Sequence, residues 1–262
     1  VRVVQPNAAQ HLKWQPDMIP VFFGRQLELT AATGPLKPDF VVWPETAIAY
    51  RLDQAQAAFD LMTDAADGVP IVFGVQRREG LRYYNSLAVL GADGRVSAVY
   101  DKHHLVPFGE YIPLADLLAP LGFGSFASQF GNGYSAGPGA HVISVAGVGK
   151  ILPLICYEAI FPNDVGAATE RADWIVHITN DAWFGKTVMP YQHLDQARQR
   201  AVEQGLAVVR SANTGVSAVI DPYGRILAEI PLGESGKIDV ALPRPVPETL
   251  YARWGDWPVG FV

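Results

Sequence analysis

The sequence predicts an α/β fold in which layers of helix cover mixed β-sheet. Short apolar runs alternate along the chain with longer segments of helical pattern, the arrangement that produces layered α/β domains. Turn residues, among them Asp93-Gly94 and the run DPYG at 221–224, separate neighbouring apolar runs and indicate hairpins. Of the 262 residues, 49% are apolar and 18% are charged, which is typical of a globular protein with a sizeable core.

In the first half of the chain, two helices are predicted between short strands. Residues 1–5 and 39–43 are apolar runs of strand length. Residues 17–33 are predicted to be helical because Pro16 precedes the segment and Gly34 follows it. The remaining elements of this half are a helix at 54–66 and strands at 70–76, 86–90 and 95–100.

The second half begins with residues 102–134, an irregular segment rich in Gly, Pro and aromatic residues. Beyond it, helices are predicted at 161–169 and 191–205. Strands are predicted at 141–145, 150–156, 174–179, 206–210, 216–221, 226–230 and 237–241. Prolines at 243, 245 and 247 cannot lie inside a sheet, so we expect a catalytic domain, residues 1–242, and a C-terminal arm, residues 243–262.

Composition argues against several classes of function. The net charge is −6 and basic residues form no cluster, so no nucleic-acid partner is expected. The single cysteine excludes an intrachain disulfide. No uncharged apolar stretch of about 18 residues occurs, which predicts no membrane-spanning helix. Because the chain opens inside a predicted strand, without Met or a signal peptide, we expect a domain cut from a longer chain or a processed protein.

The first segment suited to catalysis is VVWPET at 41–46. Glu45 lies just past the end of an apolar strand, after a proline that stops the strand. Ligands of α/β sheets gather at the carboxyl ends of strands, which makes Glu45 a candidate general base. The alternative is a glutamate at a helix start, favoured there by the helix dipole.

The second segment is YDKHHLVPFGEY at 100–111. Lys102 follows a strand, and Glu110 lies in the loop behind it. The alternative for Lys102 is an ordinary solvated loop lysine. His103 and His104 suggest a metal-dependent hydrolase, but adjacent side chains point apart on regular structure and no Cys or His partner lies nearby. We therefore expect no metal site.

The third segment is ILPLICYE at 151–158, where Cys156 ends an apolar strand and precedes a helix. A thiol at such a turn can be exposed, and a helix N-terminus favours its thiolate. The alternative is a buried, inert cysteine. Together the three segments specify covalent catalysis, with Cys156 as nucleophile, Glu45 as general base and Lys102 as the cation for a developing oxyanion.

The order and setting of these segments resemble the nitrilase superfamily over nearly the whole chain. The triad of that superfamily is Glu, Lys and Cys, matched here by Glu45, Lys102 and Cys156. The resemblance implies a four-layer α-β-β-α sandwich. It also implies that Lys102 and the backbone N–H of Tyr157 hold the oxyanion, and that Glu110 supports the base or positions the lysine.

Within the superfamily, the chain resembles the apolipoprotein N-acyltransferase family. The resemblance rests on QPN at 5–7 with LKW at 12–14, on the three segments above, and on NDAWFG at 180–185 with the later pairs QH at 192–193 and AR at 197–198. It implies that a further set of residues supports the site: Trp14, Asn85, Tyr157, Glu158 and Trp183. The alternatives are packing for the two tryptophans and helix capping for Glu158.

This second resemblance implies an acyltransferase that uses no cofactor. A fatty acyl chain would pass from a phospholipid, phosphatidylethanolamine, through a thioester on Cys156 to the N-terminal amine of a diacylglyceryl-cysteine lipoprotein. The site would face the periplasm at the surface of the bacterial inner membrane, and the arm would lead towards a transmembrane helix outside this chain. The apolar residues 112–127 are expected to be a lid that contacts lipid, with a core-packed crossover as the alternative.

Two other functions remain open at the level of sequence. A soluble amidase or carbamoylase, which hydrolyses a small C–N substrate, would keep both the fold and the triad. A non-catalytic module would keep the fold in order to bind lipid or a membrane partner. The presence of Glu45, Lys102 and Cys156 together disfavours the second of these.

Overall fold

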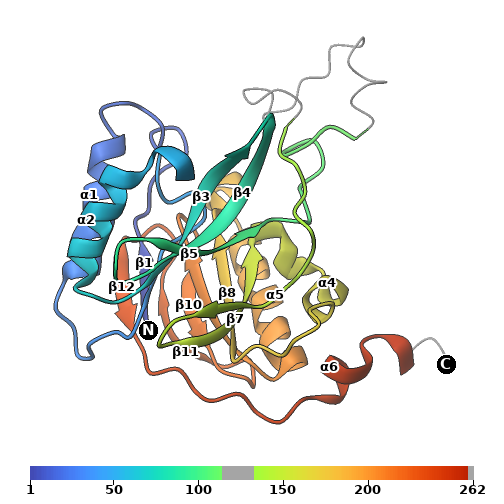
Figure 1. Cartoon of the computed structure of the whole chain (residues 1–262). Coiled ribbons are helices and arrows are strands. Elements are labelled where there is room, and N and C mark those ends of the chain that lie inside the picture. The colour runs from blue at the N-terminus through green and yellow to red at the C-terminus, as the bar shows by residue number, and fades with distance from the viewer. Residues whose placement is uncertain (114–132, 259–262) are drawn as a thin grey trace.

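Two six-stranded sheets pack face to face in the computed structural model, which describes residues 1–113 and 133–258 (Figure 1). The strands of the first sheet are, in spatial order, β12 (Gly236–Asp239), β1 (Arg2–Gln5), β2 (Val41–Val42), β3 (Ile71–Glu79), β4 (Arg82–Leu90) and β5 (Val96–Asp101). Those of the second sheet are β11 (Ile226–Ile230), β10 (Ser217–Ile220), β9 (Ala207–Ala212), β8 (Trp174–Thr179), β7 (Gly149–Ile155) and β6 (Ile143–Val145).

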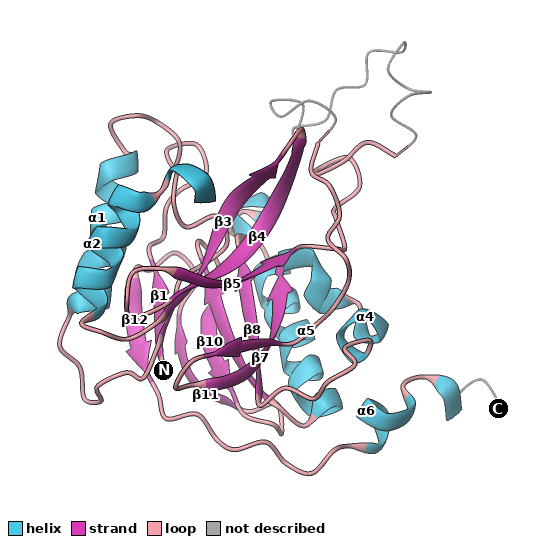
Figure 2. Ribbon diagram, in the orientation of Figure 1, coloured by secondary structure: helices cyan, strands magenta, loops and turns pink. Residues whose placement is uncertain are grey.

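Helices cover the outer face of each sheet (Figure 2). The first sheet carries α1 (Ile19–Ala31) and α2 (Gln56–Ala66), and the second carries α4 (Pro162–Gly166) and α5 (Met189–Gln204). Short 3₁₀ helices lie at loop positions of the described residues: η1 (Leu52–Gln54), η4 (Cys156–Ile160) and η5 (Asp181–Phe184). The predicted four-layer α-β-β-α arrangement is therefore confirmed.

Alternate residues of each central strand face different layers, which explains why most residues of these strands are apolar. Val42 lies in the core between the sheets, whereas its neighbours Val41 and Trp43 lie in the core beneath α1 and α2. In the second sheet, Ile155 faces the first sheet and Leu154 lies in the core beneath α5. Burying each such side chain stabilises the fold by about 1.5–3 kcal/mol, so both faces of the strand must be apolar.

The functional loops lie at one edge of the sandwich because of strand direction. β2 pairs in parallel with β1 and β3, and β8 pairs in parallel with β7 and β9. β5 runs in the direction of β3, since both are antiparallel to β4. The carboxyl ends of β2, β3 and β5 therefore share one edge of the first sheet, and those of β7, β8 and β9 share one edge of the second.

Most predicted elements are confirmed, and the differences have local causes. β2 has two residues instead of the five predicted because Pro44 follows closely and cannot donate a ladder hydrogen bond. Of the hairpin formed by β3 and β4, the inner parts at 70–76 and 86–90 were predicted, and the outer part was missed because it is polar; Gly80, with φ of 59°, lies in its turn. The helix predicted at 161–169 is shorter, ending at Gly166. The predicted hairpin at Asp93-Gly94 is confirmed between β4 and β5.

Two further predictions concern membrane-spanning helices and the apolar lid. Across the described residues, no helix combines the length and the apolar character that crossing a membrane requires. The lid expected over residues 112–127 lies outside the described residues from residue 114 onward. After β12 the chain runs past α5, where the N–H of Val246 donates to the carbonyl of Gly205 (3.1 Å), and forms α6 (Leu250–Trp254).

Candidate active site

Three loops from the two sheets converge on one site. Glu45 follows β2, Lys102 follows β5, and Cys156 follows β7 on the facing sheet. The charges of Glu45 and of Lys102 both act on the pKa of the Cys156 thiol, so the three groups lie within electrostatic reach of one another. The structure thus brings the three predicted catalytic side chains together.

Close backbone packing against β3 positions Glu45. The N–H of Gly74 donates to the carbonyl of Pro44 (3.0 Å), and the N–H of Ala47 donates back to the carbonyl of Gly74 (2.8 Å). A Cβ on Gly74 would lie 2.4 Å from the backbone nitrogen of Thr46, closer than atoms can approach. Thr46 itself has φ of 47°. Only glycine at position 74 allows the Glu45 loop to lie directly on the strand.

The carboxyl group of Glu45 is buried and linked to a second glutamate through one amide. Nδ2 of Asn85 donates to Oε1 of Glu45 (2.7 Å) and to Oε1 of Glu110 (3.0 Å). Burial and the charge of Glu110 raise the pKa of Glu45, while Lys102, Asn85 and Lys13 oppose the shift. A raised pKa makes a carboxylate a better proton acceptor, which suits a general base.

Lys102 is held as a buried cation. Its side chain is 1% exposed, and Nζ lies 2.7 Å from Oε2 of Glu110. The same carboxylate oxygen accepts from the N–H of Val106 (2.8 Å), which fixes the loop around the lysine. Burial alone would lower the pKa of Lys102, but Glu110, Cys156 and Glu45 raise it above its ordinary value. The ammonium group is therefore permanent at neutral pH and can stabilise negative charge that develops beside Cys156.

Cys156 begins η4 with a left-handed backbone, φ of 51°. Burial and the charge of Glu45 raise the pKa of its thiol to about 12, against the opposing effects of Lys102 and Thr179. The helix that follows Cys156 is the short 3₁₀ helix η4, and desolvation disfavours the thiolate that a helix N-terminus would favour. The resting group is a thiol, and it needs a base to become a nucleophile.

Glu158 joins the cysteine turn to the lysine loop. It is fully buried. Its Oε1 accepts from the N–H of His103 (2.8 Å) and the hydroxyl of Tyr100 (3.1 Å), while Oε2 accepts from the N–H of Ile155 (2.8 Å). Each of these bonds to a carboxylate contributes more than a neutral one. Glu158 thus fixes the loop that follows Lys102 against the turn that presents Cys156.

The two adjacent histidines bind carboxylates of the protein. Nδ1 of His103 lies 2.7 Å from Oε1 of Glu158, and Nδ1 of His104 lies 2.5 Å from Oδ2 of Asp164. The hydrogen bond to Glu158 raises the pKa of His103. Among the described residues, no group of three or more His, Cys, Asp or Glu side chains is arranged to hold a metal ion.

The remaining predicted residues lie around the three central groups. The ring of Tyr157 packs on His104 and Phe161, with ring centroids 5.7 and 5.0 Å away. Trp14 is 43% exposed, lies 5.0 Å from Nζ of Lys13, and lines an apolar cavity of about 300 Å³ between α1 and α2. Trp183 is 59% exposed in η5. Neither tryptophan belongs to the buried core.

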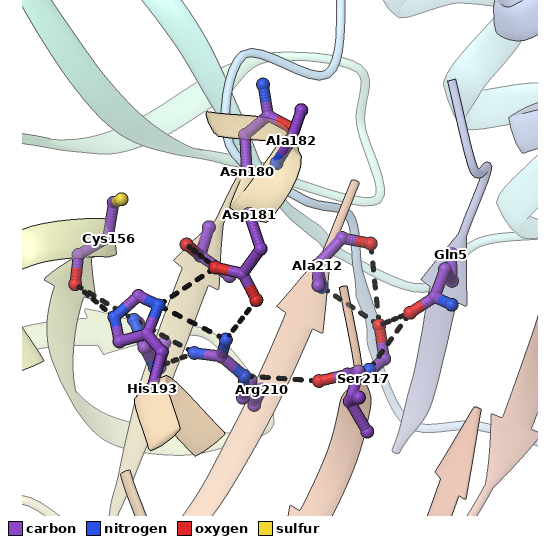
Figure 3. A network of polar contacts seen from close by, with 12 residues as sticks. Gln5, Cys156, Asn180, Asp181, Ala182, His193, Arg210, Ala212 and Ser217 are labelled. Atoms are coloured by element: carbon purple, nitrogen blue, oxygen red, sulfur yellow. Dashed lines mark hydrogen bonds and ion pairs between the residues drawn. The ribbon is translucent and has the colours of Figure 1, made fainter. Parts of the chain in front are cut away.

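Sequence reasoning missed a buried lysine beside the base. Nζ of Lys13 donates to the backbone carbonyl of Glu45 (3.3 Å), and burial lowers the pKa of Lys13 to about 8. It also missed a buried polar network behind Cys156, made by His177, Asp181, His193 and Arg210 (Figure 3). One signal could have found part of it: His177 and Arg210 interrupt strands that are otherwise apolar, where a charged or polar residue needs a buried partner.

The fold and this arrangement define a class of protein. Residues 1–249 match the sequence model of the carbon-nitrogen hydrolases, and the chain belongs to the carbon-nitrogen hydrolase family. It is 44% identical over 272 residues to the apolipoprotein N-acyltransferase of Bradyrhizobium diazoefficiens, covering 98% of this chain and 50% of that one. The apolipoprotein N-acyltransferase of Rhodopseudomonas palustris is 41% identical, with 98% of this chain and 51% of that one covered. The chain thus spans about half the length of the curated relatives it matches.

A solved structure extends the comparison to the fold. An amidase from Nesterenkonia sp. AN1 superposes with a TM-score of 0.63, covering 99% of this chain and 96% of the amidase, at 21% identity. At that level of identity, the likeness concerns the sandwich fold alone.

Proposed function

We propose that this chain carries the catalytic site of an apolipoprotein N-acyltransferase, in which Cys156 relays a fatty acyl chain from a phospholipid to a lipoprotein amine. The main support is the 44% identity to the Bradyrhizobium enzyme over 98% of this chain. The convergence of Glu45, Lys102 and Cys156 supplies the chemistry that such a relay requires.

In the first half-reaction, the carboxylate of Glu45 accepts the proton of the Cys156 thiol. The thiolate attacks an ester carbonyl of the phospholipid, and Lys102 together with the N–H of Tyr157 stabilises the resulting oxyanion. The C–O bond then breaks, the leaving lysophospholipid takes the proton from Glu45, and the acyl chain remains as a thioester. The raised pKa values of Glu45 and of Cys156 fit this sequence of steps. A thiol with a raised pKa keeps its proton until the substrate is attacked, and a carboxylate with a raised pKa accepts that proton more readily.

In the second half-reaction, the N-terminal amine of a diacylglyceryl-cysteine lipoprotein attacks the thioester. Glu45 accepts a proton from the amine and returns it to the departing sulfur, so an amide forms and the thiol is regenerated. Water must stay away from the thioester meanwhile, because hydrolysis would waste the acyl group.

Exposed aromatic side chains near the site support a membrane-facing position. Trp14, Phe108 and Trp183 are 43%, 65% and 59% exposed, and they lie next to Lys13, in the Lys102 loop and after β8. Aromatic residues are favoured where an apolar surface meets water. In this proposal, residues 1–242 form the catalytic domain at the periplasmic surface of the inner membrane, and residues 243–262 form an arm beside it.

Intact-protein mass spectrometry tests the proposal. The chain is incubated in detergent with phosphatidylethanolamine, with the full-length Bradyrhizobium enzyme as a positive control for the assay. We expect a hydroxylamine-labile fatty-acyl adduct on the wild type and none on Cys156→Ala. Glu45→Gln should slow formation of the adduct by about 10²–10⁴-fold, the usual effect of losing a general base. Glu28→Gln, at an exposed position, should leave the rate of formation unchanged.

Two outcomes would contradict the proposal: an adduct that persists in Cys156→Ala, or release of ammonia from small amides without any acyl adduct from the phospholipid. The second outcome would favour the amidase or carbamoylase alternative.

A further inference from the structure

The backbone carbonyl of Cys156 points into the buried network behind the site. Its oxygen lies 3.1 Å from Nε2 of His177 and 3.2 Å from Nε2 of His193 (Figure 3). The sulfur of Cys156 lies on the opposite side of the residue from this oxygen (Figure 3). Both imidazoles are buried, with 0% and 4% exposure, so these contacts do not compete with solvent.

Arg210 determines which nitrogen of His177 carries the hydrogen. Its Nη1 lies 2.8 Å from Nδ1 of His177, and a guanidinium group can only donate. Nδ1 must therefore accept, which leaves the hydrogen on Nε2, facing the carbonyl of Cys156. Burial and the charge of Arg210 keep the pKa of His177 well below its ordinary value, so the ring stays neutral.

Arg210 is in turn fixed by Asp181. Its Nη2 donates to Oδ2 of Asp181 (2.6 Å), and its Nε donates to the carbonyl of Val216 (3.1 Å). The other oxygen of Asp181 accepts from the hydroxyl of Thr179 (3.1 Å) and lies 2.8 Å from Nδ1 of His193. Arg210 and Asp181 both have 0% exposed side chains. Breaking such a buried pair is strongly unfavourable, so the guanidinium has one position.

Anchoring the carbonyl of Cys156 also fixes the direction of the Tyr157 N–H. The peptide unit that joins these two residues is planar and trans, so its C=O and N–H point to opposite sides. A hydrogen bond from His177 to the carbonyl therefore turns the N–H of Tyr157 towards the side opposite the network. It also opposes any flip of the unit out of the left-handed conformation of Cys156, in which a residue other than glycine is disfavoured.

We propose that His177, with its tautomer set by Arg210 and Asp181, is a positioning residue that orients the Tyr157 N–H towards the oxyanion. The inference rests on the proposed function, since an oxyanion forms only when Cys156 attacks a carbonyl group. In this proposal, Asp181 and the polar residues beside it do more than pack the core, because they set the tautomer of His177. His177 itself does not touch the substrate.

Two matched variants of His177 test this role. In His177→Asn, the amide oxygen can take the position of Nδ1 and keep the contact with Arg210, but the shorter side chain no longer reaches the carbonyl of Cys156. In His177→Gln, the longer side chain can serve both partners. The rates of Cys156 acylation by p-nitrophenyl butyrate and of its alkylation by iodoacetamide are measured by mass spectrometry, with folding checked by thermal melting.

Acylation passes through an oxyanion, whereas alkylation displaces iodide without one. We expect His177→Asn to slow acylation by about 10–100-fold, somewhat less than the loss of an oxyanion donor itself, with alkylation nearly unchanged. His177→Gln should restore acylation. Equal slowing of both reactions, or an unchanged acylation rate in His177→Asn, would overturn the inference.

A measurement on the wild-type chain makes the test independent of how the variants fold. ¹⁵N NMR of the histidine side chains should show His177 as the neutral ring with hydrogen on Nε2, and hydrogen on Nδ1 would overturn the inference. Acylation by p-nitrophenyl butyrate but not by phosphatidylethanolamine would contradict only the proposed function. Failure with both donors would contradict the function and the inference together.

Discussion

Glu45 and Cys156 have raised pKa values for the same reason: burial disfavours the charged form of each group. The charge of Glu45 also raises the pKa of the Cys156 thiol, while Lys102 lowers the pKa of both groups. Both shifts favour the neutral forms, so the thiolate of Cys156 forms only when its proton can move to another group. A nucleophile controlled in this way reacts with a positioned substrate and stays inert otherwise.

A substitution at Lys13 can change the pKa of Glu45 while Glu45, Lys102 and Cys156 all stay in place. Its positive charge opposes the raised pKa of Glu45, so Lys13→Met should raise that pKa further. Acylation needs the carboxylate form and is lost as the pH falls through the pKa of Glu45. The acid limb of the pH–rate profile should therefore move to higher pH in Lys13→Met. Lys13→Arg keeps the charge and serves as the control; an unmoved acid limb in Lys13→Met would contradict this coupling.

At the scale of elements, close contact between β3 and the Glu45 loop constrains the site. In Gly74→Ala, the new Cβ would lie 2.4 Å from the nitrogen of Thr46 and 2.6 Å from Cα of Glu45, so the loop must move. We expect acylation to fall by about 10²-fold, since a displacement of about 1 Å can have this effect. Gly24→Ala in α1 is the matched control, because nothing lies within 4 Å of its new Cβ. Wild-type acylation in Gly74→Ala would show that the loop tolerates the displacement.

The sequence predicted the elements well where their pattern was strongest. Strands such as β8 were located because burial on both faces makes most of their residues apolar. The outer part of the β3–β4 hairpin was missed because its polar residues face solvent and give no core signal. The convergence of Glu45, Lys102 and Cys156 followed from strand ends and the family resemblance.

The residues that sequence reasoning missed are those whose partners are distant in the chain. Lys13 contacts Glu45, and Arg210 contacts His177 and Asp181, only because the two sheets fold together. Composition and spacing contain no information about such pairs. The raised pKa of the Cys156 thiol could not be predicted from the sequence either. Burial causes it, and burial is a property of the complete fold.

For the whole molecule, the core between the sheets is expected to dominate stability. Leu87 on β4 is fully buried in this core, whereas Leu81 at the tip of the same hairpin is 91% exposed. Leu87→Ala should lower the free energy of unfolding by about 2–5 kcal/mol, the range for deleting a buried leucine side chain. Leu81→Ala should change it by less than about 0.5 kcal/mol. Urea denaturation measures both, and equal effects would contradict the described packing.

The pairing of the first strand with the last has a consequence for how the chain is made. β1 lies between β2 and β12, and the N–H groups at Val1 donate to the carbonyl of Val240, almost the full length of the chain away. During synthesis, β1 emerges before β12, so the edge that pairs with β12 stays open until more than 230 further residues have been added. An unpaired strand edge can join another chain, so the nascent protein is expected to need shielding by chaperones until β12 arrives.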